Sequence, residues 1–294
     1  AITGLPAYKD LRSPIIYNGT NFVTGVRTYD LNSGTPNTDI LISADGYNWS
    51  AALNIPFEII GGIDYDPVNN ETVLSAWTRG TPYYIWAIYS STDAGVTWTQ
   101  LTTRDSQYYG MTVGDVTAYN GAVTIGGNSS GNYNRSTFGG GWGWTTTSPK
   151  ANTCVYSNGT WSGFLSGYGN RSYKVTTGAP GQYNTWTNAN IFGGDYVNAY
   201  ALRRQGTNIW FSCFRTGTVQ RPRLYRSTDN GINWTQMYQL GASNNVVNKL
   251  IEHNGNMIFI GGTVTYSYDG TTLNNLGTTP VDFGALASIN HIGK

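Results

Sequence analysis

Two decapeptides of nearly the same sequence, STDAGVTWTQ and STDNGINWTQ, occupy residues 91–100 and 227–236. A match of this length within one chain indicates an internal repeat. Weaker copies are SADGYNWS at 43–50, SYDGTTL at 267–273, and two Gly-rich segments that contain Trp144 and Trp186. The closing aromatic or apolar residue of the copies recurs every 39 to 49 residues, so six units of about 45 residues fill the chain.

Each unit also contains a second pattern, in which two apolar runs flank a turn. Examples are SPIIYNGTNFVTG at 13–25 and DVTAYNGAVTIGG at 115–127. Asn-Gly between alternating apolar residues predicts a β-hairpin, since both residues tolerate the positive φ of a tight turn. We therefore expect four strands per unit. The predicted units are about 11–55, 56–104, 108–148, 149–190, 191–240 and 241–280.

Four-stranded units in series predict an all-β chain, specifically a six-bladed β-propeller that forms a single domain over residues 1–294. The composition agrees, because 38 Gly, 22 Tyr and 10 Trp with 11% charged residues are typical of turn-rich β proteins. The tail at 281–294 is expected to act as a closing strand. A seventh, incomplete blade remains an alternative.

The repeated turn resembles the Asp-box (BNR) motif, Ser-x-Asp-x-Gly-x-x-Trp. Two copies are complete and two are shortened. The matching residues are Ser91, Asp93, Gly95 and Trp98, then Ser227, Asp229, Gly231 and Trp234, and in the short copies Ser43, Asp45, Trp49, Ser267 and Asp269. The resemblance implies a propeller with the motif on the outer turn between the third and fourth strands. Asp would accept N–H hydrogen bonds, Gly would allow the turn, and Trp would be buried beneath it. One carboxylate per turn predicts a structural role and no metal site.

A ligand would then bind on the opposite loops, where several Arg and Tyr residues occur. Arg27, Arg79 and Arg215 follow their hairpin turns by eight or nine residues. Guanidinium groups and aromatic rings suit acidic or hydroxyl-rich sugars. The candidate ligand-binding residues are Arg27, Arg79, Arg215, Arg135, Arg171, Tyr29, Tyr84 and Tyr133. The alternative is that these are ordinary solvated loop residues.

Catalytic motifs are weak in this sequence. The resemblance extends to sialidases. A sialidase would be expected to have an arginine triad, a Tyr–Glu pair as nucleophile and an Asp as acid/base. The chain has three Glu, namely Glu58, Glu71 and Glu252. Glu71 and Glu252 have no evident Tyr partner, and the place of Glu58 is left open. Glycoside hydrolysis generally needs two carboxyl groups flanking the bond. We expect no catalytic residue, no metal and no cofactor, with a sialidase-like glycoside hydrolase kept as an alternative.

The net charge is only +1 and the sequence has no long apolar run. We therefore expect no nucleic-acid partner and no membrane partner. The first residues, AITGLPAYKD, lack the pattern of a signal peptide. The Asn-, Gly-, Thr- and Tyr-rich composition is similar to that of bacteriophage virion proteins. We expect a non-enzymatic structural or receptor/glycan-binding component of a virion, such as a tail fibre or capsid appendage, with other virion proteins or surface glycans as partners. A free lectin is an alternative, and self-association is left open.

Overall fold

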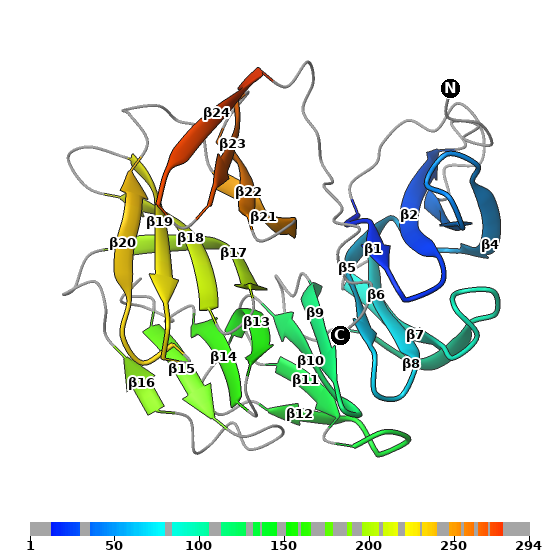
Figure 1. Cartoon of the computed structure of the whole chain (residues 1–294). Helices are drawn as coiled ribbons and strands as arrows, with labels where there is room; N and C mark the ends of the chain where they lie inside the picture. The colour runs from blue at the N-terminus through cyan, green and yellow to red at the C-terminus, as the bar shows by residue number, and fades with distance from the viewer. Residues whose placement is uncertain are drawn as a thin grey trace. The chain divides into compact units, whose positions relative to one another are not determined.

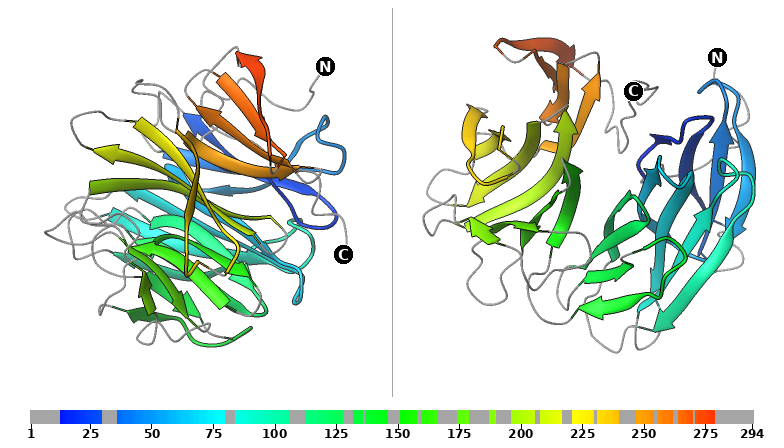
Figure 2. Two further views of the ribbon diagram at one scale, coloured as in Figure 1. Left: turned by 60° about the vertical axis from the view of Figure 1, so that its left-hand side comes forward. Right: turned by 60° about the horizontal axis from the view of Figure 1, so that its bottom comes forward.

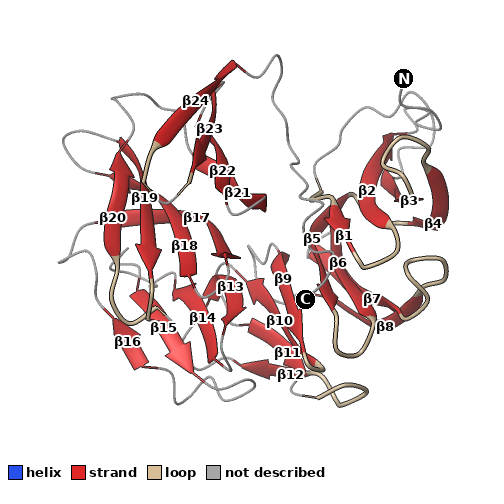
Figure 3. Cartoon of the chain, in the orientation of Figure 1, coloured by secondary structure: helices blue, strands red, loops and turns tan. Residues whose placement is uncertain are grey.

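The computed structural model describes a chain of β-strands and turns. The described residues are 13–29, 36–79, 84–105, 113–127, 132–135, 137–145, 151–157, 160–165, 174–178, 187–189, 196–205, 208–216, 221–229, 231–239, 247–253, 256–261, 264–269 and 271–278. Within these ranges there are 24 strands and no helix (Figure 3). The predicted all-β class is confirmed.

The strands form six four-stranded antiparallel sheets, each made of strands that are consecutive in the sequence (Figure 1). The chain divides between residues 144 and 145 into two compact units, which are described separately. The first unit contains three sheets. Their strands are β1 (Ile16–Tyr17), β2 (Phe22–Tyr29), β3 (Pro36–Ser43) and β4 (Ser50–Ile55); β5 (Ile59–Asp66), β6 (Glu71–Arg79), β7 (Tyr84–Ser91) and β8 (Thr99–Asp105); and β9 (Val113–Tyr119), β10 (Ala122–Gly127), β11 (Asn132–Arg135) and β12 (Gly143–Thr145).

The second unit contains the other three sheets, built in the same way. Their strands are β13 (Ala151–Ser157), β14 (Thr160–Leu165), β15 (Lys174–Gly178) and β16 (Thr187–Ala189); β17 (Tyr196–Gln205), β18 (Asn208–Thr216), β19 (Arg221–Ser227) and β20 (Thr235–Gln239); and β21 (Val247–His253), β22 (Asn256–Gly261), β23 (Val264–Tyr268) and β24 (Leu273–Thr278). The strands within each sheet are twisted relative to one another, as both views of Figure 2 show.

Consecutive sheets of a unit contact each other mainly through the first strand of each sheet. In the first unit β5 lies against β1, β2 and β9, and in the second unit β17 lies against β13 and β21. The middle sheet of each unit therefore has a neighbouring sheet on either side, and alternate residues of one strand contact different neighbours. In β7, Ala87 packs in a cluster with Val23 and Ile40 of the first sheet, while Ile88 packs with Val116 of the third sheet.

The Asn-Gly turn between β9 and β10 has the predicted backbone. Asn120 has φ of 48° and Gly121 has φ of 80°, so both central residues are left-handed, as a two-residue hairpin turn requires. The turn after β1 is different, because only Gly19 has positive φ, at 88°. There the Asn18 side chain accepts a hydrogen bond from the Asn21 N–H at 2.9 Å.

Each sheet has the four-stranded meander expected of a propeller blade, and sheets within a unit pack through their first strands. The predicted closing strand at 281–294 lies outside the described residues. The number of blades therefore stays a prediction.

Candidate functional site

The repeated segments 43–49, 91–98, 227–234 and 267–273, which we call the aspartate turns, connect the third and fourth strands of four sheets. In the second of these turns, Asp93 accepts a hydrogen bond from the Thr97 N–H at 2.8 Å. Ser91 Oγ donates to Asp93 at 2.8 Å and accepts from the Gly95 N–H at 2.9 Å. The Trp98 indole N–H donates to the Gly95 carbonyl at 2.8 Å. The motif residues are thus connected to one another within a single turn.

The third aspartate turn repeats this arrangement. Asp229 accepts from the Asn233 N–H at 2.8 Å, Ser227 accepts from the Gly231 N–H at 2.8 Å, and the Trp234 indole donates to the Gly231 carbonyl at 2.9 Å. In the shortened turns Asp45 accepts from the Asn48 N–H at 2.7 Å and Asp269 from the Thr272 N–H at 2.7 Å. All four carboxylates therefore stabilise the backbone of their own turn, the arrangement that the sequence predicts.

These hydrogen bonds favour the charged carboxylates and lower their pKa values. The Asn48 and Tyr47 N–H groups lower the pKa of Asp45 far below its ordinary value. Hydrogen bonds from the Thr97 hydroxyl and N–H lower the pKa of Asp93, and the Thr272 and Thr271 N–H groups lower that of Asp269. For Asp229, burial raises the pKa, but hydrogen bonds from Asn233 outweigh it and the pKa is lowered.

The Trp residues of these turns are less buried than the sequence predicts. Trp49, Trp98 and Trp234 are half-buried. Trp98 packs against the core cluster between the first and second sheets with part of its ring. Its indole N–H also has to reach a turn carbonyl near the surface, which explains the remaining exposure.

The candidate arginines lie near the ends of second strands, but not in equal register. Phe22, Thr72 and Ile209 each pair with the Ser that begins the aspartate turn of their own sheet. Arg27, Arg79 and Arg215 follow these residues by five, seven and six positions. Strand residues alternate between the two faces of a sheet. Arg27 and Arg79 are an odd number of positions from the residue that pairs with Ser, whereas Arg215 is an even number away, so Arg215 has the opposite register parity. Their equal spacing from the hairpin turns therefore does not place the three arginines in equal register, because the turns differ in length.

Arg27 forms an ion pair between the first and second sheets. Its Nη2 lies 3.0 Å from Oε1 of Glu58, which immediately precedes β5. The side chains of Arg27 and Glu58 are 21% and 17% exposed, so the pair is reachable from solvent. Arg27 thus connects two sheets and presents a limited surface.

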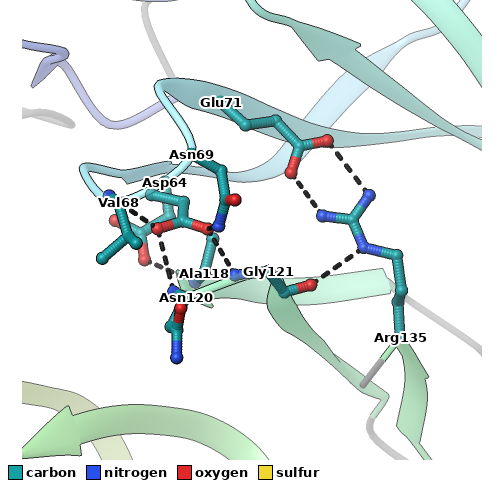
Figure 4. A network of polar contacts seen from close by, with 9 residues as sticks. Asp64, Val68, Asn69, Glu71, Ala118, Asn120, Gly121 and Arg135 are labelled. Atoms are coloured by element: carbon teal, nitrogen blue, oxygen red, sulfur yellow. Dashed lines mark hydrogen bonds and ion pairs between the residues drawn. The ribbon is translucent and has the colours of Figure 1, made fainter. Parts of the chain in front are cut away.

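Arg135 connects the second and third sheets and is buried. Its Nη1 donates to Glu71 Oε1 at 3.0 Å, its Nη2 donates to Glu71 Oε2, and its Nε donates to the Gly121 carbonyl at 3.1 Å (Figure 4). Its guanidinium carbon also lies 5.6 Å from the ring centre of Phe138 and 5.4 Å from that of Trp142. With 3% of its side chain exposed, Arg135 has no accessible donor. This geometry does not fit the expected role in ligand binding.

Two aspartates extend this network along the same pair of sheets. Asp66, which is fully buried, accepts from the N–H groups of Val68 at 3.0 Å, Asn120 at 2.9 Å and Gly121 at 2.6 Å. Asp64 accepts from the Ala118 N–H at 2.8 Å. The segment DYDPVNNE, 64–71, supplies these acidic groups, and its unusual density of carboxylates is the one sequence signal for the network.

Six candidate ligand-binding residues remain. The side chains of Arg79, Arg215, Tyr29, Tyr84 and Tyr133 lie outside the described part, although their backbones are in strands, and Arg171 lies outside the described residues altogether. Across the ranges that the structure describes, no three His, Cys, Asp or Glu side chains gather as metal ligands. None of the described segments is a helix able to cross a membrane.

Comparison with known proteins identifies the fold. No protein-family model and no curated protein matches this sequence. Solved structures similar to it include the GH74 enzyme of Niastella koreensis, with 18% identity and a TM-score of 0.63 over 95% of this chain and 47% of that chain. This chain thus spans about half the length of that enzyme.

Two further similar structures match over most of their own length. YCF48 bound to a D1 peptide has 16% identity and a TM-score of 0.57 over 96% of this chain and 90% of that one. The β-propeller domain of the Trilobed protease from Pyrococcus furiosus has 10% identity and a TM-score of 0.58 over 92% and 86% of the two chains. The fold of this chain is a β-propeller. Its neighbours include enzymes and a peptide-binding protein, so the fold leaves the function open.

Proposed function

We propose that this chain is a non-enzymatic β-propeller that binds a glycan or a neighbouring protein as a component of a larger assembly. The observation that carries this proposal is the use of the glutamates. Glu58 and Glu71 each form a salt bridge with an Arg of an adjacent sheet. Both carboxylates are thus engaged by a guanidinium group, and Glu71 is in addition buried away from any substrate. This use of glutamate favours a structural over a hydrolytic role.

The binding face in the first unit is assigned to the edge where the second strands end. Arg27 and Tyr29 are at the end of β2, Arg79 ends β6, and Tyr84 begins β7. Arg27 and Arg79 have the same register parity in neighbouring sheets. Side chains of one parity at the same edge can contact one ligand, and Arg with Tyr suits acidic or hydroxyl-rich sugars.

The assembly that we propose is a bacteriophage virion, with the chain as an Asp-box propeller of a tail fibre or capsid appendage. The support is the sequence motif and its composition. All four aspartate turns use the Ser or Asp side chain to hold their own backbone, which is the role expected of an Asp-box. Other virion proteins and cell-surface glycans are the proposed partners.

The experiment is glycan-array binding by the whole chain, with hydrolysis of each bound glycan measured in parallel. Binding without hydrolysis is expected. Arg79→Gln should weaken binding by about 1.5–3 kcal/mol through loss of a charge-assisted hydrogen bond. Arg203→Gln is the matched control, because Arg203 lies at the opposite, hairpin end of its sheet. Hydrolysis that is lost on changing a carboxylate would replace this proposal with the glycoside hydrolase, whereas binding that is unaffected by Arg79→Gln would move the site elsewhere.

A further inference from the structure

The first unit exposes apolar side chains along one edge. Hairpin turns join the first strand of a sheet to the second and the third strand to the fourth, so both turns lie at the same end of an antiparallel sheet. In the described part of this unit, every exposed large apolar residue lies in such a turn. These residues, which we call the apolar tips, are Tyr47, Val68, Val96 and Phe138, with exposed fractions of 64%, 55%, 52% and 49%. The turns with their flanking strand residues, which we call the hairpin edge, are 17–22, 43–50, 66–71, 91–98, 119–122 and 137–142.

Hydrogen bonds join the turns of the first and second sheets. The Asn70 side chain, in the hairpin that carries Val68, donates to the Thr92 carbonyl at 3.2 Å, in the turn that carries Val96. The hairpin after β1 contacts that turn as well, because the Asn21 side chain donates to one of its backbone carbonyls at 3.0 Å. Val68 and Val96 are therefore presented by two turns in direct contact.

The edge continues onto the third sheet (Figure 4). Asp66, at the base of the Val68 hairpin, accepts hydrogen bonds from the N–H groups of Asn120 and Gly121 in the turn after β9. Gly121 lies against Phe138, since a Cβ on Gly121 would be 3.0 Å from the Cβ of Phe138. The turns of three consecutive sheets thus form one surface. Exposed apolar residues that gather on one surface among polar groups are typical of interaction sites.

The fold does not require apolar residues at these positions. In the aspartate turns of the first unit, Tyr47 and Val96 directly follow the turn Gly. The turn at 267–273 has Thr271 in this place, and it still forms the hydrogen bond from the Thr272 N–H to Asp269. The local geometry therefore accepts a polar residue. A contact with a partner would stabilise apolar side chains that the turn itself leaves in water.

The hairpin edge is negatively charged. Its residues include Asp45, Asp66, Glu71 and Asp93, and no Lys, Arg or His. Glu71 is paired with Arg135 of β11 and is buried. Asp45 and Asp93 are exposed, and both carboxyl groups are anions at neutral pH. The edge therefore combines exposed apolar groups with two exposed anions.

We propose that the hairpin edge of the first unit docks a segment of another protein that presents aliphatic and basic side chains together. The aliphatic side chains of the partner would pack on the apolar tips, and its cations would complement Asp45 and Asp93. The same two anions disfavour an anionic lipid surface or a nucleic acid, because like charges repel.

The docking edge lies opposite the edge that is proposed for the glycan. Strand β2 begins at the hairpin edge with Phe22, and Arg27 and Tyr29 are at its other end. One molecule can therefore hold a glycan and a neighbouring protein at the same time. The inference deepens the proposed function, and it rests on that function only in making the partner a component of the same assembly.

The test measures binding of a fluorescent synthetic peptide of alternating Lys and Leu to the whole chain, by anisotropy at physiological ionic strength. We expect saturable binding. Since the chain has a net charge of +1, the peptide is not attracted to the molecule as a whole. Peptides of alternating Lys and Ser, or Glu and Leu, should bind at least about tenfold more weakly, because each lacks one complementary feature. Equal binding of either control peptide would overturn the proposal.

The variant with Val68→Thr and Val96→Thr should weaken binding of the Lys and Leu peptide about tenfold, because it removes two exposed apolar groups. Its melting temperature should stay unchanged, since both side chains are mainly in water. The matched control is Ile232→Thr with Leu276→Thr, which removes similarly exposed apolar groups, 61% and 56%, from the second unit. The control should bind like the native chain. Equal affinities of the two variants would overturn the proposal.

The variant with Asp45→Asn and Asp93→Asn tests the contribution of charge. The amide oxygen of Asn still accepts the hydrogen bonds of the turn, whereas both negative charges are removed. Binding of the peptide should weaken several-fold and should depend less on salt concentration than in the native chain. Unchanged affinity and unchanged salt dependence would overturn the assignment of a basic partner.

Sedimentation velocity and a glycan array separate the remaining outcomes. Self-association of the native chain that is abolished by Val68→Thr with Val96→Thr would assign the edge to a second copy and overturn the proposed partner. Glycan binding by a chain that does not bind the peptide would overturn the docking edge and leave the proposed function standing. Peptide binding without any glycan binding supports the docking edge and removes the glycan from the proposed function.

Discussion

Arg135 in β11 and Glu71 in β6 form a two-pronged ion pair that is almost completely buried between the third and second sheets. The guanidinium Nε is also bound by the Gly121 carbonyl, and the carboxylate of Asp66 holds the N–H of the same Gly121. The second and third sheets are thus joined by polar contacts centred on one hairpin turn, in addition to the apolar cluster that contains Val73 and Val116.

Breaking this pair should strongly destabilise the chain. Glu71→Gln leaves the Arg135 charge buried without its partner, and we expect a loss of about 3–5 kcal/mol in the free energy of unfolding. The double variant Glu71→Met with Arg135→Met should recover most of this loss, because it removes both desolvated charges. Urea denaturation measures the free energy of unfolding of the native chain and of both variants. A single variant with near-native stability would show that the pair is not a principal contact between the sheets.

The aspartate turns should contribute to stability without contributing to glycan binding. Asp229→Ala leaves the Asn233 N–H without its acceptor, and we expect a loss of about 1 kcal/mol, because the carboxylate is near solvent. Ligand affinity, measured by titration, should stay unchanged. Reduced affinity at unchanged melting temperature would instead assign the turn to the binding site.

Acid should weaken the fold through the same carboxylates. The pKa values of Asp93 and Asp229 are lowered in the folded state from the ordinary value of 3.8, so the unfolded chain binds more protons. Their stabilisation is fully present above about pH 5 and is lost as the pH falls through the folded-state pKa. The free energy of unfolding, measured in urea between about pH 6 and pH 2, should therefore decrease with acid.

The matched control is the variant with both Asp93→Asn and Asp229→Asn, whose side chains do not titrate. Its stability should depend less steeply on pH over the acidic range than that of the native chain. Identical pH profiles for the two proteins would contradict the assignment of the acid sensitivity to these turns.

The repeated turns could be read from the sequence because their interactions are local. Ser91, Asp93, Gly95 and Trp98 contact one another within a few residues, so each copy preserves a recognisable string. The strand pairs follow for the same reason, since hairpins join neighbours in the chain. The all-β class was therefore predictable.

The inter-sheet contacts were not predictable in this way. Arg135 and Glu71 are 64 residues apart, and nothing in either local sequence identifies the partner. The register of Arg215 relative to Arg27 and Arg79 depends on turn lengths at both ends of a strand, which spacing from one turn does not reveal. Spacing alone therefore groups Arg27, Arg79, Arg135 and Arg215 as one site, whereas the structure puts Arg215 in a different register and buries Arg135.

Gly121 should be one of the least replaceable glycines among the described residues. Its φ is +80°, and a Cβ at this position would lie 2.3 Å from the backbone nitrogen of Phe138. Gly121→Ala should cost more than the roughly 1–3 kcal/mol of a left-handed residue, because the turn between β11 and β12 has to move. Gly139→Ala, at φ of +68° with no atom within 4 Å of the added Cβ, is the control and should cost less. Equal losses in thermal denaturation would show that the close approach to Phe138 does not matter.

The central claim, that this propeller binds a ligand without transforming it, is tested most directly by mass spectrometry of the ligand. A glycan captured by the whole chain is incubated with it at neutral pH, eluted and weighed. The account predicts recovery of the intact mass after many binding half-lives, with no product above that of a protein-free control. A cleaved or hydrated glycan that accumulates in proportion to the protein, and that disappears in a variant with a changed carboxylate, would contradict it.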